Sequence, residues 1–478
     1  MEITSLKKGS ILEIRITDVA FGGKGIAKIE TAGGQFVVFV PNTFTGQLVR
    51  ARVVTKRKRH AECKLMDILE SSSLEQPSEF QPISGAPYIN LPIDIQKSFK
   101  QDGCLNIYKR IGHIENIEDL FDEYIESPSI WHYRNKMEYS FSAIGYNVEK
   151  QEEFDGFALG FKKRGTWWIV ENLEKDSGMF DAEFENKLKD IRKFCEASGL
   201  PAWHPPRKEG FFRYLVVRKS FETNQLLIKL VTSDTNMDQF DFGAFTAFMS
   251  DLFGERLAGL LHTVNNDIGD NAQSRLGDET VLTGKPVIEE ELLGLNFEIS
   301  MQSFFQTNPK CAELLYQKTI AYALEGDVQP DQVVMDLFCG TGTIGQIIAS
   351  RTGSRVIGVD IVEDAIENAR ENAKKNQIEN VTFYAADVNK FLYEYPDYQN
   401  KIHTIILDPP RAGISGKALK RVIELNAPHL VYVSCNPSTQ ARDIEILSEA
   451  GYKLQKLSLV DQFPHTAHVE AIAKFEKA

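Results

Sequence analysis

The first part of the chain consists of short apolar strands separated by glycine-containing turns. Apolar and charged residues alternate along Ile11–Ile16 and Val49–Val53, as they do in strands with one buried face. A glycine-rich turn lies at Phe21–Gly25, and a continuous apolar strand lies at Phe36–Val40. Several short strands in so few residues predict a small β-barrel over residues 1–68.

The middle of the chain, residues 69–298, has a mixed pattern. Its first part, Ser71–Pro92, is polar and carries four prolines, which predicts a linker, and Ile95–Ile111 has the apolar spacing of a helix. Beyond residue 125, strand-like segments alternate with the amphipathic stretches 183–198 and 237–253. These patterns predict an α+β central domain, but they identify no chemistry.

The last part, residues 299–478, alternates apolar strands with helices. Helices are predicted at 343–351 and 362–376. Five strands are predicted at 333–338, 355–360, 381–385, 404–408 and 430–434. Such alternation is typical of a mostly parallel α/β sheet of the Rossmann-like kind, with helices on both faces. In these sheets the functional residues gather at the carboxyl ends of the strands.

Length and composition limit the class of protein. A chain of 478 residues with 42% hydrophobic and 25% charged residues is a globular protein of two or three domains. The beginning of the chain has no apolar signal segment, and no apolar run approaches the length of a membrane span. Six scattered cysteines without metal-ligand spacing indicate reduced thiols and no zinc site. We therefore expect a cytoplasmic protein.

Charge is segregated along the chain. The net charge is −13, yet residues 1–66 carry 12 Lys and Arg against 5 Asp and Glu. The run Lys56–His60 follows the last predicted barrel strand, and it is either a solvated face or a phosphate-contacting surface. A basic barrel of the oligonucleotide-binding kind keeps nucleic acid possible as a partner despite the acidic total.

Three polar groups near the C-terminus suggest one chemistry. Cys435 lies in Val-Ser-Cys-Asn-Pro, Asp408 opens Asp-Pro-Pro-Arg, and Glu470 ends Phe-Pro-His-Thr-Ala-His-Val-Glu. C5 of uracil has no lone pair to attack a methyl donor, but a thiolate that adds to C6 makes C5 nucleophilic. A base must then remove the C5 proton before the thiol leaves. A lone Cys at a strand end is more often a small core residue, so the interpretation depends on the joint occurrence.

The glycine loop after the first strand of this sheet has two interpretations. Gly340–Gly345 matches GxGxxG, and the acidic Asp360 ends the next strand, as in a dinucleotide site. However, Asp336 lies just ahead of the glycines, where it would repel a pyrophosphate and attract an amino group and a sulfonium. Asp387 and the Asp408 turn also fit a sheet that binds S-adenosylmethionine. The sequence therefore favours this methyl donor over a dinucleotide.

Four motifs together resemble a known family. They are, in chain order, Asp-Leu-Phe-Cys-Gly-x-Gly, Asp-Pro-Pro-Arg, Ser-Cys-Asn-Pro and Phe-Pro-His-Thr-x-His-x-Glu. Behind a small basic barrel, this order resembles the RNA uracil-5-methyltransferase family, and the N-terminal unit resembles the TRAM domain of that family. The resemblance covers nearly the whole chain and is strongest from residue 300 onward.

The resemblance implies roles for individual residues. Cys435 would be the nucleophile at C6 and Glu470 the base that takes the C5 proton. The implied cofactor-binding residues are Gln306, Phe338, Gly340, Thr343, Asp360, Asp387 and Asp408. His465 and His468 could stabilise the enolate oxygen or only fill the turn, and both stay unassigned. Arg411 stands where adenine amino-methyltransferases place an aromatic residue, and cytosine-5 enzymes usually carry a cysteine there, so uracil is favoured.

One departure from the family concerns metal. Many relatives hold an iron–sulfur cluster with four cysteines, but residues 79–87 and 169–176 contain none. We therefore predict neither a cluster nor any other metal site. An iron assay on anaerobically purified protein that found about four irons per chain would contradict this prediction.

The predicted partner is structured RNA, with the target uridine flipped out of its stack. We prefer 23S ribosomal RNA, because the bacterial tRNA T-loop enzymes of the family usually lack the barrel; tRNA is the alternative. A second alternative is a non-catalytic RNA-binding protein on the same scaffold, against which the joint presence of Cys435 and Glu470 counts. We expect a monomer without membrane contact.

Overall fold

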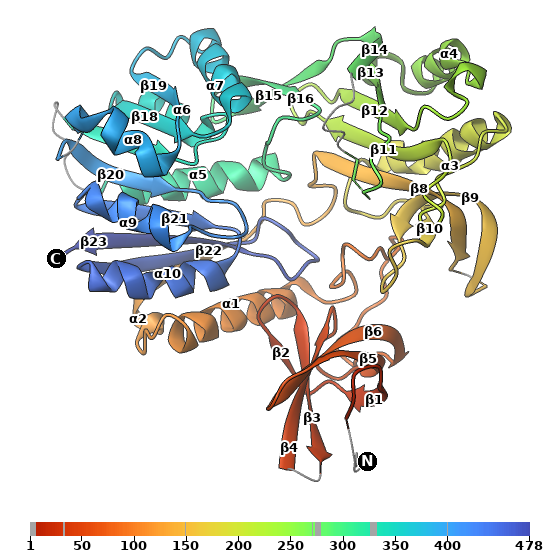
Figure 1. Ribbon diagram of the computed structural model, residues 1–478, viewed down its shortest axis with the longest axis horizontal. Coiled ribbons are helices and arrows are strands. Elements are labelled where there is room, and N and C mark those ends of the chain that lie inside the picture. The colour runs from red at the N-terminus through yellow and green to blue at the C-terminus, as the bar shows by residue number, and fades with distance from the viewer. Residues whose placement is uncertain are drawn as a thin grey trace. The chain divides into compact units, whose positions relative to one another are not determined.

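The computed structural model describes residues 6–31, 34–148, 150–269, 271–272, 279–325, 332–398 and 400–478 (Figure 1). The chain divides into two compact units, each of which is assembled from separated segments. Unit 1 consists of Met1–Ile93, Ile130–Glu290 and Glu298–Gln302. Unit 2 consists of Asp94–Ser129, Glu291–Phe297 and Ser303–Ala478. The units therefore divide the chain differently from the three consecutive segments 1–68, 69–298 and 299–478.

The N-terminal part of unit 1 is a six-stranded sheet of order β1-β5-β6-β4-β3-β2. Its strands are β1 (Ile11–Arg15), β2 (Asp18–Ala20), β3 (Lys24–Thr31), β4 (Gly34–Pro41), β5 (Leu48–Lys56) and β6 (His60–Glu70). Alternate residues of β1 and β5 are buried, which confirms the predicted pattern. Gly25 has no space for a side chain, because a Cβ atom there would lie 2.1 Å from Thr43 Oγ1. The basic residues Lys56–Arg59 are exposed where β5 turns into β6.

The proline-rich stretch Ser71–Pro92 is not a free linker, so that prediction is wrong. Ile83, Ala86 and Ile89 are buried in the core of the central part of unit 1. The Gln81 side chain donates a hydrogen bond of 2.8 Å to the carbonyl of Asn172. Apolar residues between the prolines thus pack the segment against the domain that follows it.

The central part of unit 1 is a seven-stranded sheet of order β10-β9-β8-β11-β12-β13-β14. Its strands are β8 (Lys136–Asn147), β9 (Glu152–Lys162), β10 (Val170–Asn172), β11 (Phe212–Lys219), β12 (Leu226–Thr232), β13 (Leu257–Val264) and β14 (Glu279–Gly284). Its core joins these strands to α3 (Ala182–Ala197) and α4 (Phe242–Phe253). Helix α4 begins later than the predicted stretch 237–253, because the Asp241 carboxylate caps it by accepting the amide hydrogen of Ala244. Short 3₁₀ turns precede and follow α4 at Met237–Gln239 and Gly254–Arg256.

Unit 2 contains an eight-stranded sheet of order β19-β18-β17-β20-β21-β23-β22-β7. Its strands are β7 (Phe121–Ile125), β17 (Val333–Leu337), β18 (Arg355–Asp360), β19 (Val381–Ala385), β20 (Ile402–Leu407), β21 (His429–Ser434), β22 (Tyr452–Val460) and β23 (Glu470–Lys477). All neighbours are parallel except β23, which runs antiparallel to β21 and β22. β15 (Val287–Leu292) and β16 (Leu295–Ser300) form a separate two-stranded sheet.

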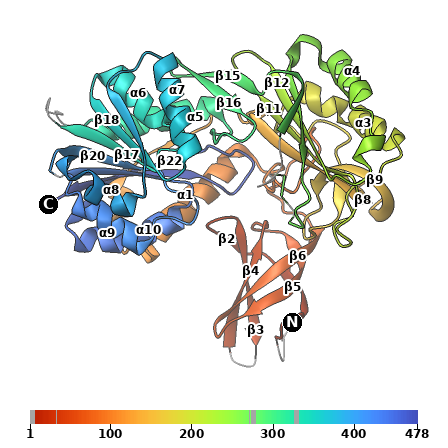
Figure 2. The ribbon, with the colours of Figure 1, turned by 45° about the horizontal axis from the view of Figure 1, so that its top comes forward.

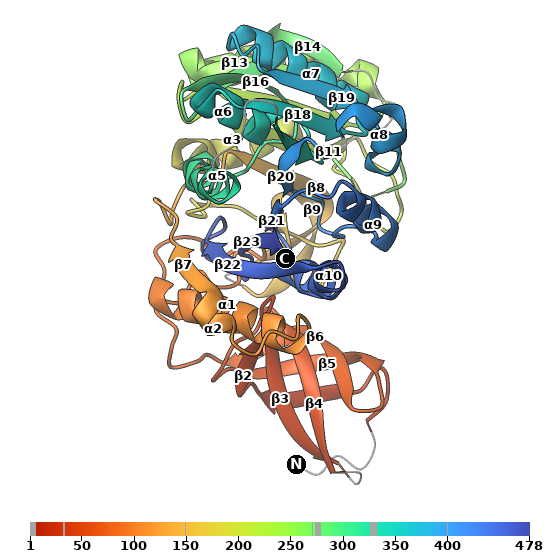
Figure 3. The ribbon, with the colours of Figure 1, turned by 90° about the vertical axis from the view of Figure 1, so that its left-hand side faces the viewer.

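Helices cover both faces of the sheet in unit 2 (Figure 3). They are α1 (Ile93–Arg110), α2 (Ile117–Leu120), α5 (Pro309–Ala323), α6 (Thr343–Thr352), α7 (Glu363–Lys375), α8 (Val388–Glu394), α9 (Gly416–Glu424) and α10 (Pro437–Glu449), with a 3₁₀ turn at Pro396–Tyr398. Helices α6 and α7 follow β17 and β18 in the predicted alternation (Figure 2). The five predicted strands and both predicted helices of this region are confirmed.

Candidate active site

The carboxyl ends of the parallel strands in unit 2 carry most of the candidate residues. Phe338 follows β17, Asp360 ends β18, Asp408 follows β20 and Cys435 follows β21. Because the strands run in the same direction, their carboxyl ends lie at one edge of the sheet. The structure therefore brings together residues that are almost one hundred positions apart in the sequence.

The glycine loop has a left-handed backbone at three positions, two of which are glycines. Phe338, Gly340 and Gly342 have φ angles of 62°, 53° and 71°. A Cβ atom at Gly342 would lie 2.4 Å from the ring of Phe383, so only glycine fits there. The Gly340 amide donates a 3.0 Å hydrogen bond to the carboxylate of Asp360, which holds that carboxylate beside the loop.

Asp336, just ahead of the loop, is fully buried on β17. Its Oδ2 accepts a 3.0 Å hydrogen bond from the amide of Gly345, whereas no described residue donates to its buried Oδ1. Burial, followed by the nearby Asp408, raises its pKa to about 8. An unsatisfied buried carboxylate oxygen fits the ammonium group of S-adenosylmethionine, and a bound cation would lower this pKa.

Gln306 is buried in the segment that leads into α5. A hydrogen bond links its side chain to the hydroxyl of Tyr316, whose pKa is raised by burial and then by Asp408. Gln306 therefore lies in the neighbourhood of the strand ends. The buried Thr343 begins α6, and its hydroxyl lies 3.4 Å from that of Thr341.

Asp387 lies just beyond β19, at the start of α8. The neighbouring Ala386 amide donates a 2.8 Å hydrogen bond to the Asp360 carbonyl, which places Asp387 at the same edge of the sheet. Its own carbonyl accepts hydrogen bonds from the amides of Lys390 and Phe391 in the first turn of the helix. All the predicted donor-contacting residues thus belong to the edge formed by β17, β18, β19 and β20 or to the start of α5.

Exposed apolar side chains at this edge were missed by sequence reasoning. Ile361 and Val362 follow Asp360 directly and are 70% and 52% exposed, so they offer an apolar surface next to the glycine loop. Phe304, two residues before Gln306, is 70% exposed. A large apolar residue directly beside a predicted polar contact is the signal that could have identified them.

Cys435 and Glu470 lie at facing positions of neighbouring strands. Ser434, the last residue of β21, pairs with Ala471 of the antiparallel β23. Cys435 and Glu470 are therefore the next residues along this register. Glu470 is 3% exposed and Cys435 is half-buried, so a thiol and a buried carboxylate meet at the same edge as the glycine loop.

The surroundings of this pair favour the uncharged forms of both groups. Burial raises the pKa of Cys435 to about 11, and Glu470 and Asp408 add to this effect. Burial and then Asp408 raise the pKa of Glu470 to about 8, while burial raises that of Asp408 to about 7. The guanidinium of Arg411 opposes the shift at both Cys435 and Glu470. Further positive charge at this edge would favour a thiolate and a free carboxylate.

The two unassigned histidines differ in their surroundings. His465 is 2% exposed and has a left-handed backbone with φ 64°. Its ring Nδ1 lies 3.1 Å from Nε2 of Gln96 on α1. His468 is exposed, and its ring centroid lies 6.2 Å from that of Phe463.

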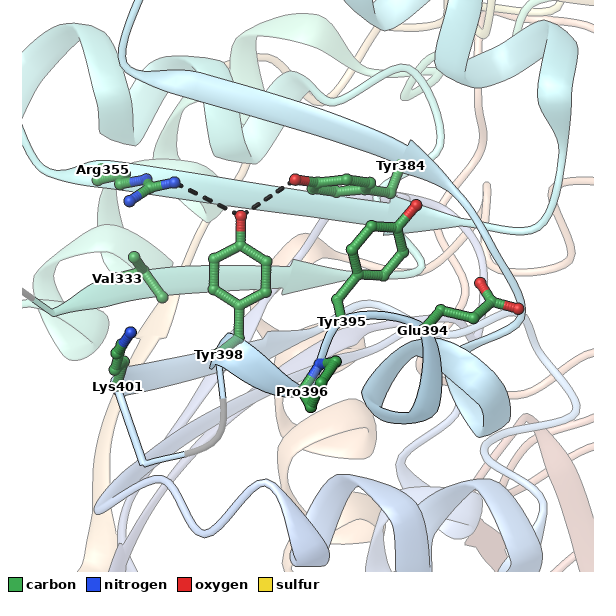
Figure 4. A pocket seen from close by; sticks show the side chains of 8 residues that line it. All are labelled: Val333, Arg355, Tyr384, Glu394, Tyr395, Pro396, Tyr398 and Lys401. Atoms are coloured by element: carbon green, nitrogen blue, oxygen red, sulfur yellow. Dashed lines mark hydrogen bonds between the residues drawn. The ribbon is translucent and has the colours of Figure 1, made fainter.

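A cavity of about 390 Å³ lies elsewhere in unit 2 (Figure 4). Val333 and Arg355, which line it, begin β17 and β18, and Tyr384, Tyr395 and Tyr398 complete one wall. None of the candidate residues lines this cavity. Within the described residues, no group of three or more His, Cys, Asp or Glu is arranged to hold a metal ion. No helix in the described part of the chain is long and apolar enough to cross a membrane.

Known proteins share this architecture. Residues 5–65 match the TRAM domain family, and residues 329–471 match a methyltransferase domain family. An uncharacterized RNA methyltransferase of Clostridium acetobutylicum is 37% identical over 99% of both chains. Another, from Caldanaerobacter subterraneus, is 36% identical over 99% of this chain and 100% of the relative.

A solved structure is also similar over the whole length. It is the Pyrococcus abyssi tRNA (uracil-54, C5)-methyltransferase in complex with S-adenosyl-L-homocysteine. The two chains are 27% identical, the match covers 98% of this chain and 100% of the other, and the TM-score is 0.69.

Fold and site define an S-adenosylmethionine-dependent methyltransferase with a Rossmann-like catalytic sheet, which confirms the predicted fold class and methyl donor. The chain belongs to the family of RNA methyltransferases that carry an N-terminal TRAM domain.

Proposed function

We propose that this protein transfers a methyl group from S-adenosylmethionine to C5 of a uridine in RNA, with Cys435 as nucleophile and Glu470 as base. The observation that carries the proposal is the meeting of a thiol and a buried carboxylate at facing ends of β21 and β23. A methyltransferase that acts on a nitrogen or oxygen atom needs no such thiol, because its substrate already has a lone pair.

The reaction uses the two side chains in sequence. Cys435 adds as a thiolate to C6, and the electrons of the C5–C6 double bond move through C4 onto its oxygen. Bound S-adenosylmethionine supplies a methyl carbon that its sulfonium makes electrophilic. C5 bonds to that carbon as the bond between the methyl carbon and the sulfonium breaks, and the electrons of that bond leave with S-adenosylhomocysteine. Glu470 then takes the C5 proton, and the electrons of the broken C–H bond restore the C5–C6 double bond as the Cys435 thiolate leaves C6.

The shifted pKa values suggest that bound S-adenosylmethionine also changes the charge of Cys435 and Glu470. In the protein alone, the thiol of Cys435 and the carboxyl of Glu470 both hold their protons near pH 7, since their pKa values are about 11 and 8. A sulfonium close to both groups would lower both pKa values, and Arg411 acts in the same direction. The active charge state would then form when the donor is bound.

The remaining site residues would bind S-adenosylmethionine and the target uracil. Asp360 would accept the ribose hydroxyls, and Ile361 and Val362 would cover a face of the adenine near Asp387. The glycine loop from Phe338 to Thr343, together with Gln306 and Asp408, would surround the methionine part. The exposed ring of Phe304 is suited to stack on a flipped base.

For the RNA, 23S ribosomal RNA and tRNA remain two candidates. The preference for 23S RNA rests on the presence of the TRAM barrel. However, the Pyrococcus abyssi tRNA enzyme is similar over 98% of this chain, a span that includes the barrel. The barrel alone therefore does not choose between the two RNAs, and tRNA is the second candidate.

The decisive experiment combines methyl-labelled S-adenosylmethionine with unmodified total RNA, followed by size fractionation and nucleoside analysis. We expect label in 5-methyluridine of the large ribosomal RNA, whereas label in tRNA would keep the chemistry and change the target. Cys435→Ala should abolish labelling while donor binding persists. Normal labelling by this variant would remove the covalent mechanism, and no labelling by the wild-type protein would favour a binding function.

A further inference from the structure

Helix α1 buries an unusual row of side chains. Gln96, Lys100, Cys104 and Tyr108 are four residues apart, so they lie along one face of the helix, and each is 0–3% exposed. A helix that packs against a sheet usually buries aliphatic residues along such a row. An amide, an ammonium group and a phenol are costly to bury unless each has a hydrogen-bonding partner.

The partner of Gln96 is His465, in the segment that leads to Glu470. The side-chain oxygen of Gln96 accepts a 2.8 Å hydrogen bond from the His465 amide. The side-chain nitrogen Nε2 of Gln96, which can only donate, lies 3.1 Å from the ring Nδ1 of His465. Nδ1 is therefore the acceptor, and the neutral ring carries its proton on Nε2. One side chain thus fixes the backbone, the left-handed turn and the tautomer of His465.

The partners of Lys100 lie in the same segment. Its Nζ donates a 2.6 Å hydrogen bond to Asp461 and a 3.0 Å hydrogen bond to the carbonyl of Phe463. Both charged side chains are almost fully buried, at 1% and 4% exposure. Breaking such a pair by removing one partner leaves an uncompensated buried charge.

A second helix, α5, also holds this segment. Asn308, at the start of α5, donates a 3.2 Å hydrogen bond to the Gln462 carbonyl and accepts one of 3.0 Å from the Gln462 side chain. The segment 461–465 is consequently bonded to α1 or α5 at positions 461, 462, 463 and 465.

Tyr108, the last residue of the α1 row, contacts α10, the helix that follows Cys435. The hydroxyl of Tyr108 donates a hydrogen bond to the side-chain oxygen of Gln440 on α10. Gln440 in turn donates a 2.7 Å hydrogen bond to the carbonyl of Tyr432 on β21, three residues before Cys435. One helix face is therefore connected to the segments that carry both Cys435 and Glu470.

We propose that α1 is a positioning helix for the reaction, in which Gln96 and Lys100 hold the 461–469 segment so that Glu470 meets the C5 proton. The proposal rests on the proposed function of Cys435 and Glu470. A displacement of about 1 Å in a catalytic group can cost on the order of 100-fold in rate. The helix lies outside the stretch 329–471 that matches the methyltransferase domain.

The test compares substitutions of buried residues with substitutions of exposed residues on the same helix, in the full-length protein. Gln96→Leu and Lys100→Met remove the anchors. Asn106→Leu and Lys109→Met are the matched controls, because both residues are exposed and the ammonium of Lys109 pairs with Glu118 at the surface. The double variant Lys100→Met/Asp461→Asn removes the unpaired buried charge as well, which separates lost stability from lost positioning.

Three readouts distinguish positioning from folding: the affinity for S-adenosylhomocysteine, the trapping of 5-fluorouridine RNA, and turnover on normal RNA. Fluorine cannot leave C5 as a cation, so the fluorinated RNA stays attached to Cys435 after methyl transfer without any proton removal. We expect Gln96→Leu to bind S-adenosylhomocysteine and form this adduct normally, yet to turn over normal RNA roughly 10- to 100-fold more slowly. Normal RNA should then accumulate as a covalent adduct. The controls should match the wild-type protein.

The double variant should regain melting temperature relative to Lys100→Met but not turnover. Turnover that recovers together with the melting temperature, or normal turnover in Gln96→Leu, would overturn the positioning role. Equal losses of turnover and adduct formation would also overturn it, since the defect would then precede proton removal. If the wild-type protein traps no fluorinated RNA, the proposed function fails, and the role of α1 in it falls with it.

Discussion

Two buried glutamates, one in each unit, show how a carboxylate held by hydrogen bonds differs from the one that we propose as the base. Glu185 on α3 is 1% exposed, and it accepts hydrogen bonds from the amide of Ser177 at 2.6 Å and from the hydroxyls of Ser177 and Tyr139 at 3.0 Å each. Glu470 is 3% exposed, and no hydrogen bond from a described residue contributes to the pKa of its carboxyl. Burial raises both pKa values, to about 7 for Glu185 and about 8 for Glu470.

The difference lies in what surrounds the charge. The hydrogen bonds to Glu185 lower its pKa against the effect of burial, so they stabilise its charged form where it stands. Near Glu470 the next-largest influence is another carboxylate, Asp408, which raises the pKa further. A carboxylate with open lone pairs and a poor solvation shell gains most by taking up a proton, which suits a base.

The largest expected effect concerns Glu470. Glu470→Gln keeps the shape but cannot accept the C5 proton, so turnover should fall by about 10²- to 10⁴-fold. Methyl transfer precedes this step, and the RNA should therefore remain covalently attached to Cys435. Denaturing gel electrophoresis with labelled RNA detects the adduct, and Cys435→Ala/Glu470→Gln is the control that should show none. A slow variant without an adduct would place the defect before methyl transfer.

Next in size is the pH dependence of the thiol. Because the pKa of Cys435 is about 11, its thiolate fraction, and with it the rate of alkylation by iodoacetamide, should rise about tenfold per pH unit between pH 7 and 10. Mass spectrometry of the peptide that contains Cys435 gives the rate at this site. In Glu470→Gln the same curve should lie at lower pH, since one charge that raises the thiol pKa is gone. A plateau below pH 9 in the wild-type protein would contradict the assigned surroundings.

Glu185→Gln should act on stability alone. The amide would turn a donor toward the donors of Ser177 and Tyr139, which should cost about 1–3 kcal/mol of the free energy of unfolding. Urea unfolding measures this loss, while methylation per folded molecule should stay at the wild-type level. A large loss of turnover at full stability would mean that the comparison between the two glutamates is wrong.

The smallest effect is on the pH dependence of stability. A carboxyl whose pKa rises on folding binds protons more strongly in the folded state, so its contribution is largest at low pH and is lost as pH rises. For Glu470 this loss runs from the ordinary pKa of 4.5 up to about 8. Glu470→Gln should therefore melt at a higher temperature than the wild-type protein at pH 8, with the gap closing toward pH 4.5. A difference in melting temperature that grew toward low pH would contradict this prediction.

The sequence predicted most of the catalytic sheet because its signals are local. The strands at 355–360 and 381–385 were predicted residue for residue, since alternating strands and helices leave apolar runs of clear length. The motifs named Cys435 and Glu470 as candidates, and the structure brings them to facing strand ends, while their roles stay predictions. The partners of Lys100 could not be predicted, because a polar residue in a helix looks solvent-exposed until its distant partner is known. The prediction of a linker at Ser71–Pro92 was wrong for a related reason, because the apolar residues between its prolines pack on the core.

The strand β7 and helix α1 also determine when the catalytic unit can be completed during synthesis. The ion pair between Lys100 and Asp461 joins residues 361 positions apart. At about 5–20 residues per second, roughly 20 to 70 s separate the synthesis of its two halves. During that interval the segment 94–129 lacks the strands with which it pairs, while the whole of the central part of unit 1 is synthesised. The last strands of the chain therefore complete the sheet for the segment 94–129, and a nascent chain stopped before β22 would leave β7 without its partner strand and prone to aggregate.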